Sequence, residues 1–510
     1  MIRRQSVGIL GMMIVALGMV WAQDNTTPPS DSQVPQQPVA AYGQENAPSI
    51  PIDENPPLSG LDLPSLQEHA APLSYLQPGA TVSESAVTNA GNALGGNTVG
   101  SVTRGLGTLA LRRLWSHYDL ALDYVGGTGY YQKAGGWRLL QDLGIAQKIE
   151  WKRGQLSLRD SFSYLPEGNF GGAYGSLGSI GMGGIGNIPG SLLTGGSEFG
   201  ALGLTPRIMN VSLAEISENL SPKSAVTATG GYTFTHFYGT DEVSGASFIG
   251  SSQTSAQGGY NRILTPHTQI AAAYGYQAFD FSVAGTAFHS HVIQGMYGHR
   301  ISGRMDLLLG AGPQITLIDS PSQVCSDPSI SDALSCLLAG NQVFTQTIRD
   351  TKIGVAAQAR LRYRLRNSSL DLRYRRVETS GAGLFAGAQT DVVRFAVEHP
   401  LSRVWNLSVD LGYSHNHRLQ PLTPQQLLEC SLNTLAACPA NDARSYNNGF
   451  AGAALHRHFG REFHGFVSYQ FNELSFDQNF CLSNAPCNRI SNRQVVTFGL
   501  DWTPRPIRID

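Results

Sequence analysis

Six arginines occur at every second position along two neighbouring stretches of the chain. They are Arg360, Arg362, Arg364, Arg366, Arg373 and Arg375. Successive side chains of a β-strand point to opposite faces, so residues two apart share one face. If the two stretches are strands of one hairpin, the six guanidinium groups lie together, with Asp371 as the only opposite charge on that face. Such a face would hold a local positive potential and attract anions.

A second interpretation of these arginines is structural. In that interpretation they form ion pairs with acidic residues on neighbouring strands, for instance Glu398 and Asp410, and fill space between the strands. The sequence leaves both interpretations open.

Other groups that could carry chemistry lack the partners that the chemistry needs. The sequence contains three His-x-His pairs, which are His289 with His291, His415 with His417, and His456 with His458. Each pair shares one strand face and could chelate a metal, but no third ligand is identifiable. Ser290 lies between two histidines that would point to the opposite face, which disfavours a nucleophile and base pair. We therefore predict no metal site and no enzyme.

One glycine-rich stretch matches a cofactor motif by letters alone. Residues 181–186 read Gly-Met-Gly-Gly-Ile-Gly, which fits the GxGxxG pattern of dinucleotide-binding sites. That pattern needs a preceding strand and a following helix, and neither is indicated here. The sequence predicts no cofactor.

The elements around the arginines alternate in polarity over unusually long stretches. Trp405, Leu407, Val409, Leu411 and Tyr413 alternate with small or polar residues. The same alternation recurs from about residue 79 onward in segments of roughly 10 to 15 residues, whereas strands of soluble sheets have about 5 or 6. Aromatic residues gather at the segment ends, where a membrane interface would lie. The pattern indicates tilted strands that cross a membrane, with one apolar face and one polar face.

Eight tight polar turns separate these strands. They fall near residues 115–117, 152–155, 220–223, 264–267, 301–304, 366–369, 400–403 and 459–462. Eight turns join sixteen strands, and a first strand near 79–90 and a last near 493–503 bring the number to 18. Strands in lipid must close on themselves, because an open edge leaves unpaired amides in hydrocarbon. We predict an all-β fold, a single antiparallel meander barrel of about 18 strands (16–18), over residues 76–510.

Composition agrees with a wall that meets lipid. Charged residues make up 14% of the chain, against roughly 25% in soluble domains. The formal net charge of -2 argues against a nucleic-acid partner, which usually requires a basic excess.

The N-terminal residues indicate export. Arg3 and Arg4 precede an apolar run from Val7 to Val20, and we expect cleavage of a signal peptide after Ala22, which gives a signal peptide of residues 1–22. Residues 23–75 are rich in Pro, Gln and Ser, so we expect a flexible, disordered spacer.

The cysteines lie in pairs within three long connections, expected near 319–350, 419–445 and 478–490. The pairs are Cys325 with Cys336, Cys430 with Cys438, and Cys481 with Cys487. Fifteen pairings are conceivable, but export permits disulfides and two cysteines per connection favour local bonds. Zinc binding is the alternative, and the CxxC spacing of zinc sites is absent.

The whole pattern resembles bacterial outer-membrane porin-like barrels. The final strand, in which Val496, Phe498, Leu500 and Trp502 alternate with polar or small residues, is similar to the terminal strand recognised by the barrel-assembly machinery. It departs from that pattern because a Pro-containing tail follows Trp502. The resemblance implies insertion in outer-membrane lipid, a spacer on the periplasmic side with the tight turns, and an assembly compatible with a homotrimer.

The connection at 167–206 joins the fifth and sixth strands, as does the loop that folds into the pore of trimeric porins. We expect it to narrow the pore or cover its mouth, because an apolar loop of about forty residues should not remain unpacked in water. Its candidate constriction residues are Glu167, Ile180, Ile185, Leu192 and Glu198.

Two functions therefore remain in view. The first is a pore for passive diffusion of small hydrophilic solutes, with anions favoured by the arginines. The alternative is a structural or adhesive surface barrel with a plugged lumen and outer loops that bind a ligand.

Overall fold

The computed structural model describes the chain from residue 74 onward, with gaps. The described residues are 74–89, 98–133, 136–165, 207–238, 249–282, 286–327, 329, 335–336, 339–365, 368–381, 383–420, 443–460, 462–480 and 488–509. The expected signal peptide at 1–22 and nearly all of the expected spacer at 23–75 lie outside them.

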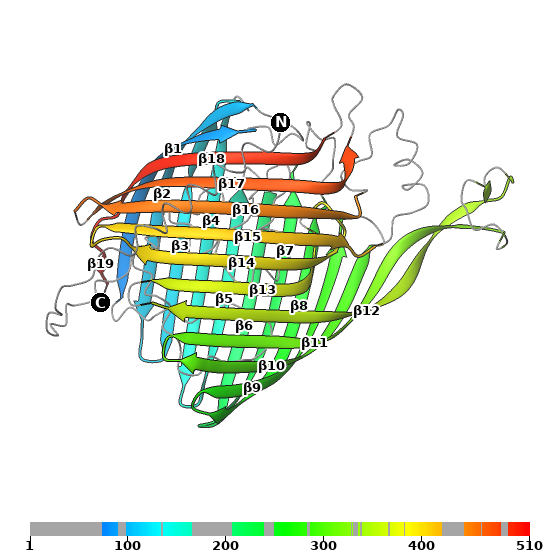
Figure 1. The fold of residues 1–510 in the computed structure, drawn as a ribbon, viewed down its shortest axis with the longest axis horizontal. Helices are drawn as coiled ribbons and strands as arrows, with labels where there is room; N and C mark the ends of the chain where they lie inside the picture. The colour runs from blue at the N-terminus through cyan, green and yellow to red at the C-terminus, as the bar shows by residue number, and fades with distance from the viewer. Residues whose placement is uncertain are drawn as a thin grey trace. The chain divides into compact units, whose positions relative to one another are not determined.

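Long antiparallel strands make up almost all of the described chain (Figure 1). The first nine are β1 (Tyr75–Thr88), β2 (Val99–Leu114), β3 (Tyr118–Tyr131), β4 (Gly136–Trp151), β5 (Gly154–Leu165), β6 (Arg207–Ser221), β7 (Ser224–Phe237), β8 (Ser251–Thr265) and β9 (Thr268–Phe281). The remaining ones are β10 (Ala287–Ser302), β11 (Met305–Cys325), β12 (Val343–Arg364), β13 (Ser369–Thr379), β14 (Ala388–Pro400), β15 (Trp405–Arg418), β16 (Ser445–His458), β17 (Phe463–Phe480), β18 (Asn488–Trp502) and the short β19 (Ile507–Arg508).

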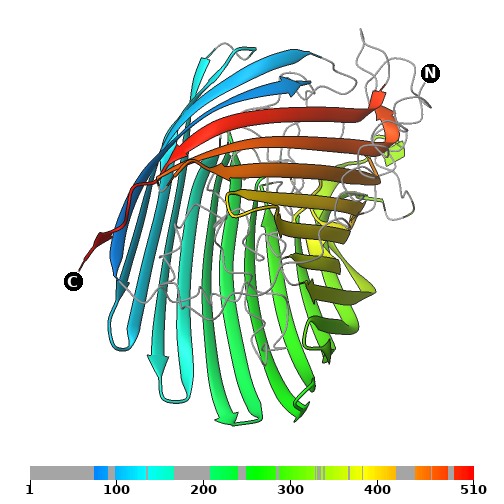
Figure 2. The same ribbon diagram turned by 60° about the vertical axis from the view of Figure 1, so that its left-hand side comes forward.

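Each strand pairs with the next, and the first strand pairs with the eighteenth (Figure 2). This closing seam runs from Ala80 opposite Trp502 to Val87 opposite Val495. Closure leaves no open edge between β1 and β18, as strands in lipid require. The prediction of a single closed meander barrel of 18 strands is confirmed.

The C-terminal tail completes the seam. Beyond Trp502, β19 pairs with Tyr75 and Leu76 at the start of β1, and the amide of Ile509 donates a hydrogen bond of 3.1 Å to the carbonyl oxygen of Ser74. The tail therefore covers the edge of β1 that β18 does not reach.

All eight tight turns lie at one end of the barrel, at the predicted places; for example, residues 152–153 join β4 to β5 and residues 222–223 join β6 to β7. We call this the turn end and the opposite one the loop end. Residues 74 and 509 both lie at the turn end.

The long connection expected at 319–350 is wrong in its bounds. Strands β11 and β12 stay paired as far as Cys325 opposite Val343, whereas β12 leaves β13 after Ala357 opposite Arg376. The hairpin thus continues beyond the wall as a two-stranded ribbon (Figure 1). Strands β11 and β12 can stay paired there because two strands can hydrogen-bond to each other without a third strand beside them.

A disulfide joins Cys325 to Cys336 at the far end of this ribbon, with a Cα–Cα distance of 5.6 Å. The other four cysteines lie outside the described residues. We predict that non-reducing peptide mapping recovers the 325–336 link and that reduction leaves the barrel folded, because closure rests on hydrogen bonds between strands. A link from Cys325 to a cysteine of another connection would contradict the pairing.

Side chains alternate between a polar interior and an apolar exterior. Outward residues such as Val82, Ile293 and Phe498 expose 62%, 59% and 56% of their surface, while inward Ser290 and Asn448 are fully buried. Among the described residues, no helix is long and apolar enough to span a membrane.

An aromatic girdle marks the turn end of the exterior. Trp115, Trp151 and Trp502 are exposed there, and the guanidinium group of Arg457 lies 5.1 Å from the Trp405 ring centroid. Aromatic rings with a polar or charged neighbour suit the boundary between hydrocarbon and headgroups.

Candidate functional site

The arginine-rich stretches form neighbouring strands whose arginines face the interior. Arg360 lies directly opposite Arg373, and Arg362 lies opposite Asp371. Leu361 and Leu372 take the other face, which is the apolar exterior. The alternation of arginine with leucine and tyrosine in the sequence thus fixes which face each residue occupies.

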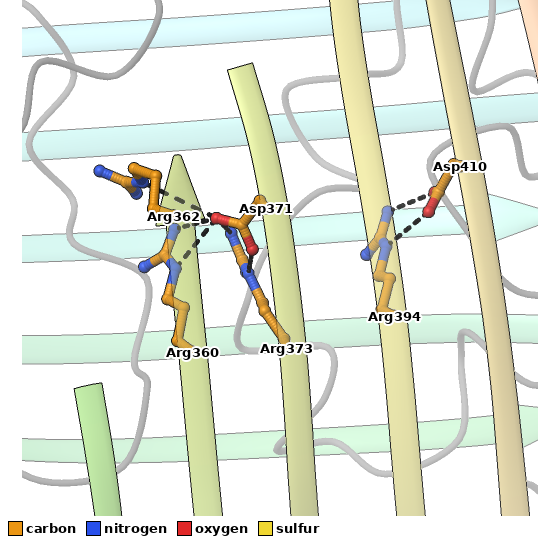
Figure 3. A network of polar contacts seen from close by, with 6 residues as sticks. All are labelled: Arg360, Arg362, Asp371, Arg373, Arg394 and Asp410. Carbon is orange, nitrogen blue, oxygen red and sulfur yellow. Dashed lines mark hydrogen bonds and ion pairs between the residues drawn. The ribbon is translucent and has the colours of Figure 1, made fainter. Parts of the chain in front are cut away.

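One carboxylate holds three of these arginines together (Figure 3). The Asp371 side chain lies 2.8 Å from Arg360, 3.7 Å from Arg362 and 2.5 Å from Arg373. All four side chains are partly exposed, between 17% and 26%. Three positive charges share one negative charge, so this cluster has a net positive charge.

A neutral ion pair stands beside this cluster. Arg394 on β14 donates two hydrogen bonds, of 3.1 and 2.7 Å, to the two carboxylate oxygens of Asp410 on β15. Such a bidentate pair has its charges matched and its geometry fixed. Its contribution to the net charge of the wall is therefore close to zero.

The remaining predicted residues have different outcomes. Arg364 and Arg375 lie on the same interior face as Arg360, and Arg375 is buried. Arg366 lies outside the described residues, as does the side chain of Glu398. Asp410, one of the expected acidic partners, forms a bidentate ion pair with Arg394 of β14, the strand between β13 and β15.

Together these residues form what we call the basic wall. It consists of inward side chains toward the turn end of β12 to β15, namely Arg360, Arg362, Arg364, Arg373, Arg375, Arg394, Asp371 and Asp410. Its described side chains thus comprise six arginines and two aspartates. The inward Arg300–Asp306 ion pair lies beside it, with Asp306 opposite Arg362.

The opposite side of the ring carries mixed charges. Strand β4 lies half a ring from β13. The inward charged residues of β3 to β6 are Asp119, Asp123, Asp142, Glu150 and Glu215, together with Arg138, Lys148, Arg159 and Arg207. Positive and negative groups nearly balance on these four strands, in contrast to the basic wall.

A segment that sequence reasoning missed lies at the loop end next to this wall. Residues 380–387 join β13 to β14, and we call them the strap. Leu384 and Phe385 of the strap are fully buried. Pairing of β13 with β14 continues to Thr379 opposite Ala388, beyond the point where β13 has left β12. The strap therefore follows a hairpin end that has separated from β12 but is still paired with β15.

Contacts of the strap come from distant parts of the ring. The Ile249 amide, just before β8, donates a 2.8 Å hydrogen bond to the Gly383 carbonyl oxygen, although β9 to β12 separate β8 from β13. On the other side, the Phe385 ring packs edge-on against Tyr446 of β16 at 5.1 Å. The strap is thus held from both sides of the interior at the loop end.

The sequence carries a trace of the strap in its glycines. Gly381, Gly383 and Gly387 have φ angles of 76°, 79° and 93°, a region that side chains with a Cβ rarely adopt. Glycines that flank a Leu-Phe pair could have indicated a tight apolar turn, but not its inward direction.

Two of the histidine pairs face outward and one faces inward: His415 and His417 lie on the outer face of β15, and His456 and His458 lie on the inner face of β16. His289 and His291 face outward, where their Nδ1 atoms lie 3.0 and 2.8 Å from the hydroxyls of Tyr276 and Tyr274. Ser290 faces inward and accepts a 2.9 Å hydrogen bond from Gln314, so it is separated from both histidines. Within the described residues, no group of three or more His, Cys, Asp or Glu is arranged to hold a metal ion.

The candidate constriction residues Glu167, Ile180, Ile185, Leu192 and Glu198, and the glycine-rich residues 181–186, lie outside the described residues. The bounds of their connection are as expected, because β5 ends at Leu165 and β6 begins at Arg207.

Closure, strand number, the apolar exterior and the polar interior together define the class of protein. The chain is a porin-like β-barrel of the bacterial outer-membrane type. This assignment follows from the physical requirements of a sheet in lipid, namely no open edge and an apolar outer face.

Comparison with known proteins adds no narrower family. No family model matches the chain, and no curated protein matches it. Among solved structures, the ferric-catecholate import receptor Fiu of E. coli K12 in its open form aligns with a TM-score of 0.41 at 8% identity, over 84% of this chain and 81% of that one.

Two Pseudomonas aeruginosa proteins align over more of their own length. OccK5 (OpdH) has a TM-score of 0.38 at 12% identity, over 85% of this chain and 98% of that one. OccK2 (OpdF), crystallised with glucuronate, has a TM-score of 0.37 at 11% identity, over 84% and 98%. The class assignment rests on the barrel itself and not on these alignments.

Proposed function

We propose that the protein is an outer-membrane pore for passive diffusion of small hydrophilic solutes, and that it favours anions. The observation that carries this proposal is the Asp371 cluster, in which three arginines share a single carboxylate. The four side chains of this cluster together carry two net positive charges, whereas Arg394 and Asp410 form a neutral pair.

The physical effect of the basic wall is to raise the local concentration of anions. Charges on one wall of a channel with a low-dielectric surround add their potentials and focus the field into the water-filled interior. Rings of basic side chains act in this way in anion-selective pores. No bond is made or broken in this mechanism, so it needs neither a catalytic group nor a cofactor.

Conductance in planar bilayers tests this function directly. We expect stepwise current increases on insertion of the purified protein, and a reversal potential across a salt gradient that indicates preference for chloride over potassium. A barrel that inserts and gives no steps would have a closed lumen, and a cation-selective one would contradict the role of the basic wall.

One observation favours the second candidate, a surface barrel whose outer parts bind a ligand. The β11–β12 ribbon extends past the wall and is pinned by the Cys325–Cys336 disulfide. A stiff, covalently closed projection is a suitable contact surface. Absence of conductance together with retained surface display would favour this candidate.

The topology has consequences for orientation. In bacterial barrels the short turns face the periplasm and the longer connections face outward. We therefore propose that the spacer at 23–75 is periplasmic after removal of residues 1–22, and that the strand ending at Trp502 is presented to the assembly machinery. Mass spectrometry of the N-terminus of the mature protein tests the cleavage site.

Association into a homotrimer is also proposed, on one feature of the exterior. Asp160 faces outward on β5, between Leu158 and Phe162, and accepts hydrogen bonds of 3.2 and 3.4 Å from the Asn210 amide. An exposed carboxylate in an apolar belt is less costly when protein covers it. Native mass spectrometry in mild detergent would show a monomer if lipid covers this patch instead.

A further inference from the structure

Three histidines lie on the interior face at the turn end of β16 and β17. His458 stands directly opposite His464, and their ring centroids are 4.6 Å apart. His456 is two residues from His458 and therefore shares its face. All three are half-buried. Their outward neighbour Arg457 stacks on Trp405 in the girdle, which fixes the inward direction of the histidines on either side of it.

The groups that face this cluster come from three neighbouring strands. Asp501 on β18 lies opposite His464, and it accepts a 2.6 Å hydrogen bond from the hydroxyl of Thr81 on β1. On the other side, β15 presents uncharged Asn406 opposite His456, with Ser408 next on the same face. Asp501 is thus the carboxylate directly opposite the histidines, while the inward Asp410 of β15 lies one inward position beyond Ser408 and pairs with Arg394.

The cluster is continuous with the basic wall. Strands β12 to β17 follow one another in the ring, and both groups lie toward the turn end. Imidazole has an ordinary pKa of about 6.5, so it is neutral above this pH and carries a positive charge below it. Each imidazole that takes up a proton adds one positive charge beside Asp501.

We propose that His456, His458 and His464 extend the basic wall to the turn-end opening when they are protonated, so that the pore selects anions more strongly in mildly acidic solution. This inference rests on the proposed pore function and names its regulation. The solute class is the small anion, and the extension acts through charge and hydrogen-bond donation from imidazolium groups.

Reversal potentials at about pH 8 and about pH 5.5, on either side of the imidazole pKa, test the proposal. We expect the ratio of anion to cation permeability to rise roughly two-fold or more in the parent on acidification, since added wall charge raises local anion concentration. The variant H456Q/H458Q/H464Q should lose most of this rise. The matched control is H289Q/H291Q/H415Q, which removes three outward histidines and should behave as the parent does.

An equal rise in the parent and in H456Q/H458Q/H464Q would overturn the proposal, as would an equal loss in the control. A parent that conducts anions but shows no rise would overturn it while leaving the proposed function intact. If the barrel gives no conductance, titration calorimetry with sulfate on the detergent-solubilised protein decides the matter. Sulfate should bind more weakly at about pH 8 than at about pH 5.5, and the triple variant should lack this difference.

Discussion

Replacing Arg362, Arg364 and Arg373 together by Gln should shift the reversal potential toward cation preference at low ionic strength. The substitution keeps bulk and hydrogen-bonding capacity but removes three positive charges from the basic wall. Asp371 would then retain Arg360 as its near partner at 2.8 Å, so this cluster would become neutral. The anion excess that the wall creates should largely disappear.

The salt dependence of this shift is part of the prediction. The reach of a charge in solution falls from about 30 Å at 0.01 M salt to about 3 Å at 1 M. The difference between parent and variant should therefore be large in dilute salt and small in concentrated salt.

A variant of opposite sign provides the control. Asp371→Asn removes the shared carboxylate and leaves all arginines in place, so anion preference should increase beyond that of the parent. If the triple Gln variant has the same ion preference as the parent in dilute salt, carboxylates across the interior neutralise the arginines and their role is structural.

Val409→Arg should destabilise the barrel by about 2–4 kcal/mol, the range for a cation near the middle of a bilayer. Val409 faces outward on β15, four positions from the girdle residue Trp405 and four from Tyr413. A guanidinium group there must leave water or reach past several residues to an interface. Unfolding in urea from lipid vesicles measures this change.

The adjacent residue gives a control at the same depth. Ser408 points into the interior, so Ser408→Arg places the same charge one residue along the backbone but on the face that meets water. We expect its free energy of unfolding to stay close to that of the parent. Equal destabilisation by both variants would mean that the faces assigned to β15 are wrong.

The sequence by itself determined the fold of the wall. Alternation such as that of Trp405 to Tyr413 assigns each residue to a face, because side chains on a strand alternate whatever lies beside it. The eight tight turns count the strands, and lipid requires the strands to close. Alternation and turns are local features, and closure is required by the lipid around the strands. The fold of the wall can therefore be predicted without knowing which distant residues are in contact.

The candidate site could be predicted only in part from the alternation of residues in the sequence. Alternation placed Arg360 and Arg373 on one face, but the partners of each charge depend on which residues of separate strands lie side by side. Register decided that Asp371 binds three arginines while Asp410 binds Arg394. The partner of Asp410 cannot be derived from one strand alone.

Only the tertiary structure shows how the segments at the loop end are arranged and how the C-terminal tail pairs with β1. Strands β12 and β13 part after Ala357 and Arg376, and from there the β11–β12 ribbon and the strap have separate courses that alternation cannot encode. Ile249 meets Gly383, and β19 meets β1, although long stretches of chain separate each pair. Local sequence specifies an element and its faces, whereas the meeting of such distant segments depends on how the closed ring brings them together.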